Sequence, residues 1–263
     1  MLDLEQIASF YPEVIHPFKK NILREYLQFK LLEIIFDTEY AHKLIFMGGA
    51  AIRIFLGNNR FSEDLDFDNF NLQKSEFIKL SDIIEKRLAG EGYKIEIRNI
   101  FKGAFHSYIA FNNVLYEHKL SPHKEEKLVI RLDSEAQKIN YKPAQFILNR
   151  FDVFTRINVV PESILLSQKL LAVLFRKRPM GRDFYDVIFL LSKTKPDLLY
   201  LKNKGNIDSP EELKSLILKK IQSLDMKRWV KDVEPFLIQP NGTKKILLFE
   251  EYIKNITFDT TDQ

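Results

Sequence analysis

The sequence contains no cysteine and only one tryptophan among its 263 residues. The absence of cysteine excludes disulfides and thiolate metal ligands, and it is typical of proteins in a reducing compartment. No run of about 18 apolar residues occurs, and the first residues lack the basic and apolar parts of a signal peptide. We therefore expect a cytoplasmic protein that makes no contact with a membrane. The formal net charge is only +4, so any surface that binds nucleic acid must be a local patch.

The hydrophobic pattern predicts an α+β protein with two lobes. Alternation with a period of two begins near Tyr93, and helical spacing replaces it from Pro161 onward. We expect a catalytic lobe at residues 1–157, with a mixed β-sheet flanked by helices, followed by a mainly α-helical lobe at residues 158–263. The expected strands are 93–100, 104–111, 126–135 and 143–151, with a loop at 112–127. The expected helices are 17–38, 74–90 (ended by a left-handed Gly90), 161–178, 181–193, 209–222, 225–236 and 243–255.

The stretch from Leu44 to Phe70 organises the chain. It reads as a buried strand, the pair Gly48-Gly49, a short helix, and a second strand with Asp64, Asp66 and Asp68 on one face. Two carboxylates about 4 Å apart repel by about 4 kcal/mol at an effective dielectric of about 20, and a divalent cation relieves this repulsion. The pattern thus predicts a metal site. We expect Asp68 to be a solvated strand end outside it.

The glycine pair adds a candidate phosphate site to the acidic strand. Glycine between a strand and a helix allows close approach of a phosphate, and the positive end of the following helix favours an anion. An Asp-x-Asp strand beside such a turn suits a nucleoside triphosphate bound through Mg²⁺. A glycine pair alone is also typical of a tight turn, and an Asp-x-Asp alone is also typical of a solvated strand face.

Four motifs in a fixed order give a more specific indication. They are Gly48-Gly49, the segment Arg60-Phe61-Ser62-Glu63-Asp64-Leu65-Asp66-Phe67, Lys169 in a helix, and Arg182-Asp183-Phe184-Tyr185-Asp186. Over residues 44–190 this series resembles the AbiEii family of nucleotidyltransferases. That family contains toxins of abortive-infection toxin–antitoxin systems and belongs to the DNA polymerase β-like nucleotidyltransferase superfamily.

The resemblance implies a role for several residues in the first lobe. Gly48 and Gly49 would form the turn over the triphosphate, Ser62 would contact a phosphate, and Arg60 would help to neutralise the phosphates. The metal ligands would be Asp64 and Asp66, with Asp133 in the place of the third carboxylate, where it would deprotonate or orient the attacking hydroxyl. Two Mg²⁺ ions are expected, with an NTP as substrate. Ala50 stands where many relatives are expected to have a small hydroxyl residue.

In the second lobe, the resemblance makes Lys169 a contact of the β and γ phosphates and Asp183 a functional side chain in the cleft. Arg182 and Asp186 would support Asp183, although their spacing also suits an ordinary surface ion pair. The predicted catalytic set is Asp64, Asp66, Asp133, Lys169 and Asp183. The five histidines lack the spacing of a zinc site, and we expect them at the surface or in loops.

The predicted activity is Mg²⁺-dependent transfer of a nucleoside monophosphate from an NTP to an acceptor hydroxyl. The resemblance suggests a toxin that acts on RNA such as tRNA, with a helical lobe that completes the cleft for the NTP and the acceptor. A genetically linked antitoxin is expected without a required direct complex. Two alternatives stay open at this point: a protein or a small molecule as acceptor, and a non-catalytic module that binds nucleotide or nucleic acid.

Overall fold

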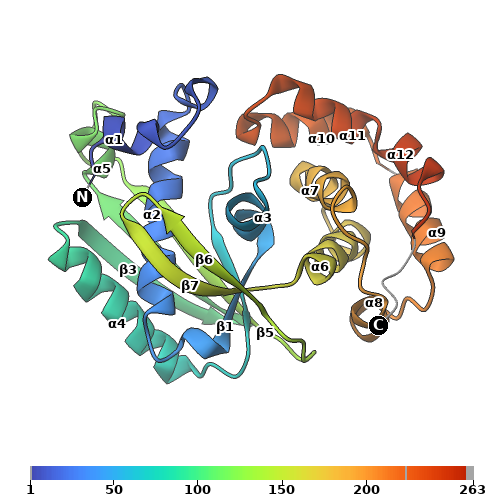
Figure 1. The fold of residues 1–263 in the computed structure, drawn as a ribbon, viewed down its shortest axis with the longest axis horizontal. Helices are drawn as coiled ribbons and strands as arrows, with labels where there is room; N and C mark the ends of the chain where they lie inside the picture. The colour runs from blue at the N-terminus through green and yellow to red at the C-terminus, as the bar shows by residue number, and fades with distance from the viewer. Residues whose placement is uncertain (1, 223, 259–263) are drawn as a thin grey trace. The chain divides into compact units, whose positions relative to one another are not determined.

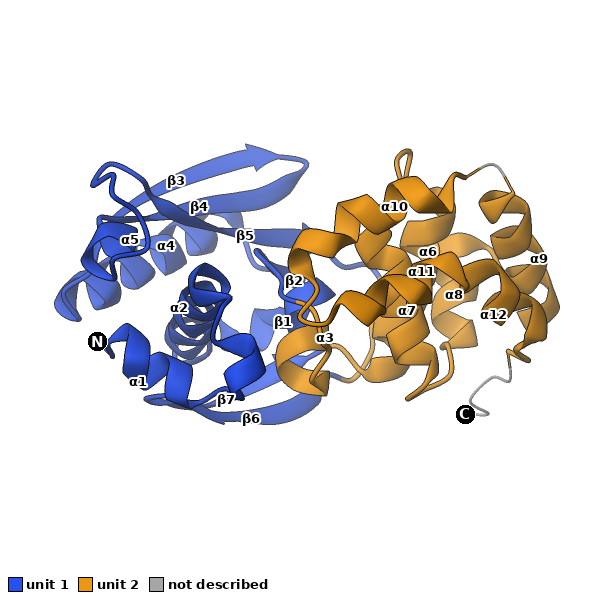
Figure 2. Cartoon of the chain, turned by 90° about the horizontal axis from the view of Figure 1, so that it is seen from above, with its two compact units in different colours: residues 1–51, 61–138, 143–159 blue, residues 52–60, 139–142, 160–263 orange. Residues whose placement is uncertain are grey.

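The computed structural model describes residues 2–222 and 224–258, and the chain divides into two compact units (Figure 2). Unit 1 consists of residues 1–51, 61–138 and 143–159, and unit 2 consists of residues 52–60, 139–142 and 160–263. The helix α3 (Gly48–Leu56) therefore begins in unit 1 and ends in unit 2.

Unit 1 is built on a mixed β-sheet, which confirms the predicted fold class. Seven strands within the described residues form it, in the order β3-β4-β5-β2-β1-β7-β6. The pairs β2/β5 and β1/β7 are parallel and the other pairs are antiparallel. The strands are β1 (Leu44–Met47), β2 (Leu65–Asn69), β3 (Lys94–Lys102), β4 (Ala104–Asn112), β5 (Leu128–Ala136), β6 (Ala144–Arg150) and β7 (Val153–Val159).

Two long helices cover one face of this sheet. The helix α2 (Lys19–Phe36) packs on β5 and β7, and α4 (Lys74–Gly90) packs on β3 and β4 (Figure 1). Aromatic side chains fill this interface: the Phe67 ring lies 6.2 Å from Phe36 on α2, and Phe77 on α4 lies 5.4 Å from Phe105. Because side chains alternate along a strand, the residues between these positions point to the other face. That face carries Asp66, His106 and Asp133.

Unit 2 is mainly helical, as the pattern after Pro161 predicts. Its core includes Phe184, whose ring lies 5.0 Å from that of Phe249 and 6.4 Å from that of Trp229. Gly181 allows the backbone of Trp229 to approach, since a Cβ at Gly181 would lie 2.1 Å from the Trp229 carbonyl oxygen. The longer helices are α6 (Glu162–Phe175), α7 (Gly181–Leu191), α8 (Leu198–Gly205), α9 (Pro210–Ile221) and α10 (Met226–Val233), and α11 (Lys244–Leu247) and α12 (Phe249–Asn255) follow.

The structure corrects four local expectations. Gly90 is the last residue of α4, and the left-handed glycine is Gly92, with φ of +93°. Asp68 is only 5% exposed, so the prediction of a solvated strand end is wrong. The strand β7 and the helix α8 were not predicted. The predicted loop at 112–127 contains a short helix, α5 (Val114–Glu117). Within the described residues, no helix is long and apolar enough to cross a membrane.

Candidate active site

Two of the predicted acidic residues, Asp66 and Asp133, lie in one row across the sheet of unit 1. Asp66 on β2 is the direct partner of Asp133 on β5, and Asp133 is in turn the partner of His106 on β4. On its other side, Asp66 is the partner of Met47 on β1. Directly opposed residues have Cβ atoms about 4.5–5.5 Å apart, and like charges in such a pair destabilise the sheet. Two opposed carboxylates therefore indicate a function other than stability.

Gly48 fits tightly against this row. It directly follows β1, has φ of +75°, and a Cβ at this position would lie 2.2 Å from Asp66 Oδ2. Both the backbone conformation and the lack of space exclude a side chain. Gly48 and Gly49 form the start of α3, where the first backbone N–H groups have no partner within the helix and favour an anion. The structure thus brings the predicted phosphate turn against a predicted metal ligand.

Two residues that were not predicted bind Asp133. His106 Nδ1 lies 2.7 Å from Asp133 Oδ1, and Arg131 Nε lies 3.0 Å from Asp133 Oδ2 as an ion pair. Arg131 also donates from Nη2 to Asp64 Oδ2 at 3.0 Å. Arg131 therefore bridges Asp64 and Asp133, and both oxygens of Asp133 are engaged by cationic or polar partners.

The electrostatic setting of Asp64 follows from these contacts. Burial raises its pKa, the Arg131 guanidinium opposes this shift, and the negative charge of Asp133 adds to it. The net effect is a raised pKa. A carboxylate in this position is stabilised in its charged form by additional positive charge.

A magnesium site in unit 1 would use two carboxylates rather than three. Within residues 2–222 and 224–258, no three His, Asp or Glu side chains are arranged to hold a metal ion. Mg²⁺ usually takes only one or two protein carboxylates together with phosphate oxygens and water. Asp66 lies against Gly48, and Asp64 is bound to Arg131. These two carboxylates are the predicted magnesium ligands, and their assignment stays a prediction. Asp133 as a third ligand stays a prediction.

Ser62 lies just before the acidic strand. Its backbone carbonyl accepts a hydrogen bond from Gln28 Nε2 at 3.0 Å, which fixes the segment on α2. Its side chain is half-buried. The phosphate contact of Ser62 stays a prediction.

In unit 2, Arg60 and Asp186 form a buried ion pair. Arg60 Nε lies 2.7 Å from Asp186 Oδ1, and Nη2 lies 2.5 Å from Oδ2, so the pairing is bidentate. Arg60 is 1% exposed and Asp186 is fully buried. Asn58 Nδ2 also donates to Asp186 Oδ1 at 3.0 Å. These contacts bind segment 52–60 to α7, which gives Arg60 a structural role and leaves its predicted phosphate contact untested.

Lys169 and Asp183 belong to the same buried cluster. Lys169 Nζ lies 3.1 Å from Asp183 Oδ1 and 2.9 Å from Asp186 Oδ2. Arg176, the half-exposed residue that caps α6, binds Asp183 Oδ2 at 2.7 Å. The structure therefore brings together Lys169, Asp183 and Asp186 as the motif order indicates. Asp186 is fully buried, so the alternative in which it forms an ordinary surface ion pair with Arg182 is wrong.

Opposing effects set the charges of this cluster. Burial lowers the pKa of Lys169, but Asp186 and Asp183 outweigh it, and the net shift is upward. Burial raises the pKa of Asp186, but Arg60 and Lys169 outweigh it, and the net shift is downward. Lys245 on α11 differs, because burial lowers its pKa and Asp186 only partly opposes the shift. The pair Lys169 and Asp186 is therefore charged at neutral pH.

Sequence reasoning missed His106, Arg131, Asn58 and Lys245. His106 was expected at the surface or in a loop, yet it lies on β4 directly opposite Asp133. The alternation in residues 104–111 is the signal that could have placed His106 on one face of a strand. Only the strand order, which periodicity does not give, brings it to Asp133.

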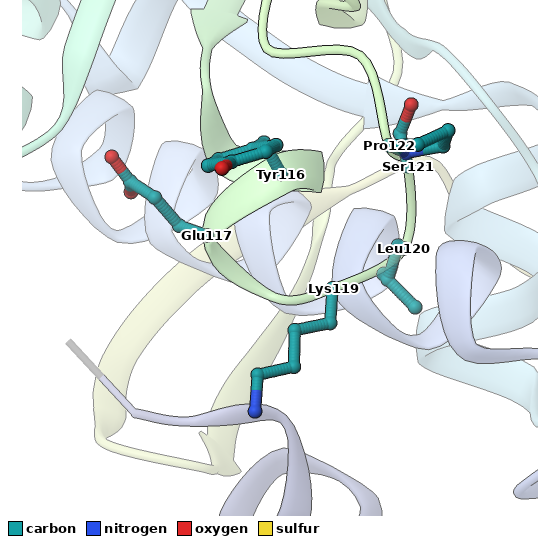
Figure 3. A pocket seen from close by; sticks show the side chains of 6 residues that line it. All are labelled: Tyr116, Glu117, Lys119, Leu120, Ser121 and Pro122. Atoms are coloured by element: carbon teal, nitrogen blue, oxygen red, sulfur yellow. The ribbon is translucent and has the colours of Figure 1, made fainter.

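A separate hollow of about 650 Å³ lies in unit 1 beside α5. Its lining does not include any of the predicted site residues, and it consists of Tyr116, Glu117, Lys119, Leu120, Ser121 and Pro122 (Figure 3). Figure 3 shows Glu117 and Lys119 extending in different directions from this segment. The hollow therefore does not combine opposed carboxylates with a phosphate-binding turn, as the row beside Gly48 does.

Comparison with known proteins identifies the family. A family model described as "Nucleotidyl transferase AbiEii toxin, Type IV TA system" matches residues 30–254. The chain belongs to the AbiEii nucleotidyl transferase toxin family. As an AbiEii protein, it is an enzyme of the nucleotidyltransferase class, and the predicted resemblance is confirmed.

Solved structures support the fold of this AbiEii protein. The crystal structure of JHP933 from Helicobacter pylori is similar with a TM-score of 0.51 and 16% identity, covering 89% of this chain and 91% of that one. A second H. pylori structure, described as a candidate nucleotidyltransferase, has a TM-score of 0.51 and 15% identity and covers 89% and 94% of the two chains. At these identities the likeness shows the fold alone. No curated protein matches the chain.

Proposed function

We propose that this AbiEii protein transfers a nucleoside monophosphate from an NTP to a hydroxyl group of an RNA, such as the 3′ end of a tRNA, in a Mg²⁺-dependent reaction. The observation that carries the proposal is the opposed pair Asp66 and Asp133, with Gly48 packed against Asp66. Opposed carboxylates beside a glycine turn at the start of a helix suit a substrate that combines phosphates with a divalent cation.

In the proposed reaction, the acceptor oxygen forms a bond to the α-phosphorus, and the bond from that phosphorus to the pyrophosphate oxygen breaks. Gly48 and Gly49 hold the triphosphate through backbone N–H groups, and Ser62 contributes a phosphate contact. Asp133 takes up or orients the hydroxyl proton. Asp64 and Asp66 would hold Mg²⁺, which would supply positive charge to the phosphate oxygens.

The residues of unit 2 have proposed roles in the same activity. Lys169 contacts the β and γ phosphates as a point charge, Asp183 is a functional side chain, and Arg60 helps to balance the phosphate charge. Lys169 lies 3.1 Å from Asp183, and Arg176 binds the same carboxylate. Mutual ion pairs of this kind keep both side chains in defined positions.

The family also suggests the setting in which the enzyme acts. A type IV toxin–antitoxin system contains a toxin and a separate antitoxin, and we propose that this protein is the toxin. We further propose that it acts in the cytoplasm in abortive infection and that its antitoxin does not need to form a complex with it.

Labelled nucleotides test the proposed reaction. Purified protein is incubated with total RNA, Mg²⁺ and each of the four NTPs, labelled on the α or the γ phosphate. Nucleotidyl transfer places the α label on RNA and never the γ label, because pyrophosphate leaves. The absence of α label on RNA with every NTP would contradict the proposal. Label on protein or on a small molecule would instead identify a different acceptor.

A further inference from the structure

We propose that Tyr108, flanked by Arg98 and Arg131 on the exposed face of the sheet, is the platform that holds the single-stranded acceptor end of the RNA. The inference rests on the proposed function, since it names where the acceptor binds beside the same carboxylates. It concerns binding residues rather than residues that react.

The three side chains form a second row across the sheet. Arg98 on β3 is the direct partner of Tyr108 on β4, and Tyr108 is the direct partner of Arg131 on β5. The neighbours of Tyr108 along β4, Ser107 and Ile109, are 1% and 0% exposed and face the helices, whereas Tyr108 is 36% exposed. Tyr108 therefore lies on the exposed face, with Arg98 on the neighbouring strand on one side and, on the other, Arg131, with which its side chain forms a hydrogen bond.

This platform is adjacent to the row of candidate catalytic residues. Tyr108 and His106 are two residues apart on the same strand, which corresponds to about 7 Å along it. Arg131 connects the two rows directly, because its Nη2 donates to Asp64 Oδ2 at 3.0 Å. A nucleotide that stacks on Tyr108 would therefore place the next nucleotide of the strand over Asp133 and Asp66.

The charge of the neighbouring strand suits a polynucleotide. On β3, Lys94, Arg98 and Lys102 are exposed on the same face as Tyr108, and their only acidic neighbour on that face of the strand is Glu96. Lys127 binds Glu96 at 2.9 Å and so neutralises it. Positive side chains attract backbone phosphates, and the aromatic ring stacks on a base of any sequence. An exposed ring beside the cations of β3 thus matches single-stranded nucleic acid better than it matches an acidic peptide.

Binding of a labelled 12-nucleotide single-stranded RNA to the full chain, without NTP, tests the platform. Loss of one stacking ring weakens binding by about 5- to 150-fold, so we expect that effect for Tyr108→Ala. Tyr108→Phe keeps the ring but loses the hydrogen bond with Arg131, so it should bind the RNA much more tightly than Tyr108→Ala does. Arg98→Gln should lower the slope of log K against log salt by about 0.7. The matched control is Tyr116→Ala, because Tyr116 is 49% exposed on α5, outside this face.

Kinetics separate the platform from the proposed function. With transfer to the same RNA as readout, Tyr108→Ala should raise the KM for RNA and leave the KM for NTP and kcat unchanged. If the wild type transfers to RNA and Tyr108→Ala binds and reacts as the wild type does, the platform is refuted and the proposed function stands. If RNA binding depends on Tyr108 but no transfer occurs, the proposed function fails and the binding site stands. Equal effects of Tyr108→Ala on a DNA strand of the same sequence would support stacking rather than recognition of the 2′-hydroxyl.

Discussion

Asp186→Asn should strongly destabilise unit 2. The substitution keeps the shape of the side chain but removes the negative charge that two buried cations share. Arg60 loses its bidentate partner, and Lys169 loses a contact of 2.9 Å. Removing one partner of a buried ion pair costs about 3–5 kcal/mol, because the other charge is left uncompensated. For a protein of this size, that loss lowers Tm by about 6–20 °C.

The fluorescence of Trp229 provides a local assay for this prediction. It is the only tryptophan in the sequence, is 6% exposed, and packs 6.4 Å from Phe184 in unit 2. Thermal unfolding followed by its emission therefore reports on the unit that contains the substitution. The matched control is Asp208→Asn, since Asp208 pairs with Lys202 at 2.9 Å in the same unit but is 66% exposed.

The comparison between the two asparagine variants decides the outcome. We expect no measurable change in Tm for Asp208→Asn, because exposed ion pairs contribute little. The double variant Arg60→Met with Asp186→Leu should regain part of the loss, because it removes both buried charges together. A Tm for Asp186→Asn equal to that of Asp208→Asn would refute the idea that this buried pair holds segment 52–60 on α7.

Three further predictions concern the same two groups of residues. Gly48→Ala should abolish transfer and lower the free energy of unfolding by about 1–3 kcal/mol through backbone strain, and unchanged activity would show that Asp66 has more room than its 2.2 Å clearance indicates. Lys169→Met should lower Tm less than Asp186→Asn does, because Asp186 keeps Arg60 and Asp183 keeps Arg176. An equal or larger fall in Tm for Lys169→Met would contradict this order. Because the pKa of Asp186 is lowered on folding, its contribution to stability is complete above the unfolded pKa of about 3.9 and is lost as pH falls through the folded pKa. Urea unfolding between pH 2 and pH 6 should thus show that the free energy of unfolding falls less at acid pH for Asp186→Asn than for the wild type. Parallel plots of this free energy against pH would contradict the prediction.

The local pattern of the sequence was sufficient for much of the fold. Apolar spacing predicted α2 and α4 within two residues of their observed ends, because a buried helix face needs a regular repeat. The strand β7 was missed since it follows β6 after only two residues, with Phe151 in a left-handed conformation at φ of +59°. Few sequence signals mark a turn made by a phenylalanine.

The candidate site was predictable where residues are close in sequence. Gly48, Asp64 and Asp66 could be connected because a strand, a glycine turn, a short helix and a second strand follow each other within the 26 residues from Leu44 to Asn69. The contacts of His106 and Arg131 with Asp133 depend on the register between β4, β5 and β2, which no local periodicity determines. The burial of Asp68 was missed for the same reason.

The buried ion-pair cluster of unit 2 could be predicted only in part from the sequence. Motif order indicated that Lys169 and Asp183 act together, and the structure places them 3.1 Å apart. The sequence could not indicate that Arg60, more than a hundred residues earlier, is the main partner of Asp186. Long-range ion pairs of this kind follow from tertiary packing alone.

Nucleotidyl transfer at the site beside Gly48 should depend on Asp66. This is measured as transfer of label from α-labelled NTP to RNA by the wild type, by Asp66→Asn and by Asp82→Asn, whose aspartate is exposed on α4. We expect transfer by the wild type and by Asp82→Asn, and loss of transfer by Asp66→Asn at an unchanged Tm. Transfer by Asp66→Asn at the rate of the wild type would contradict it.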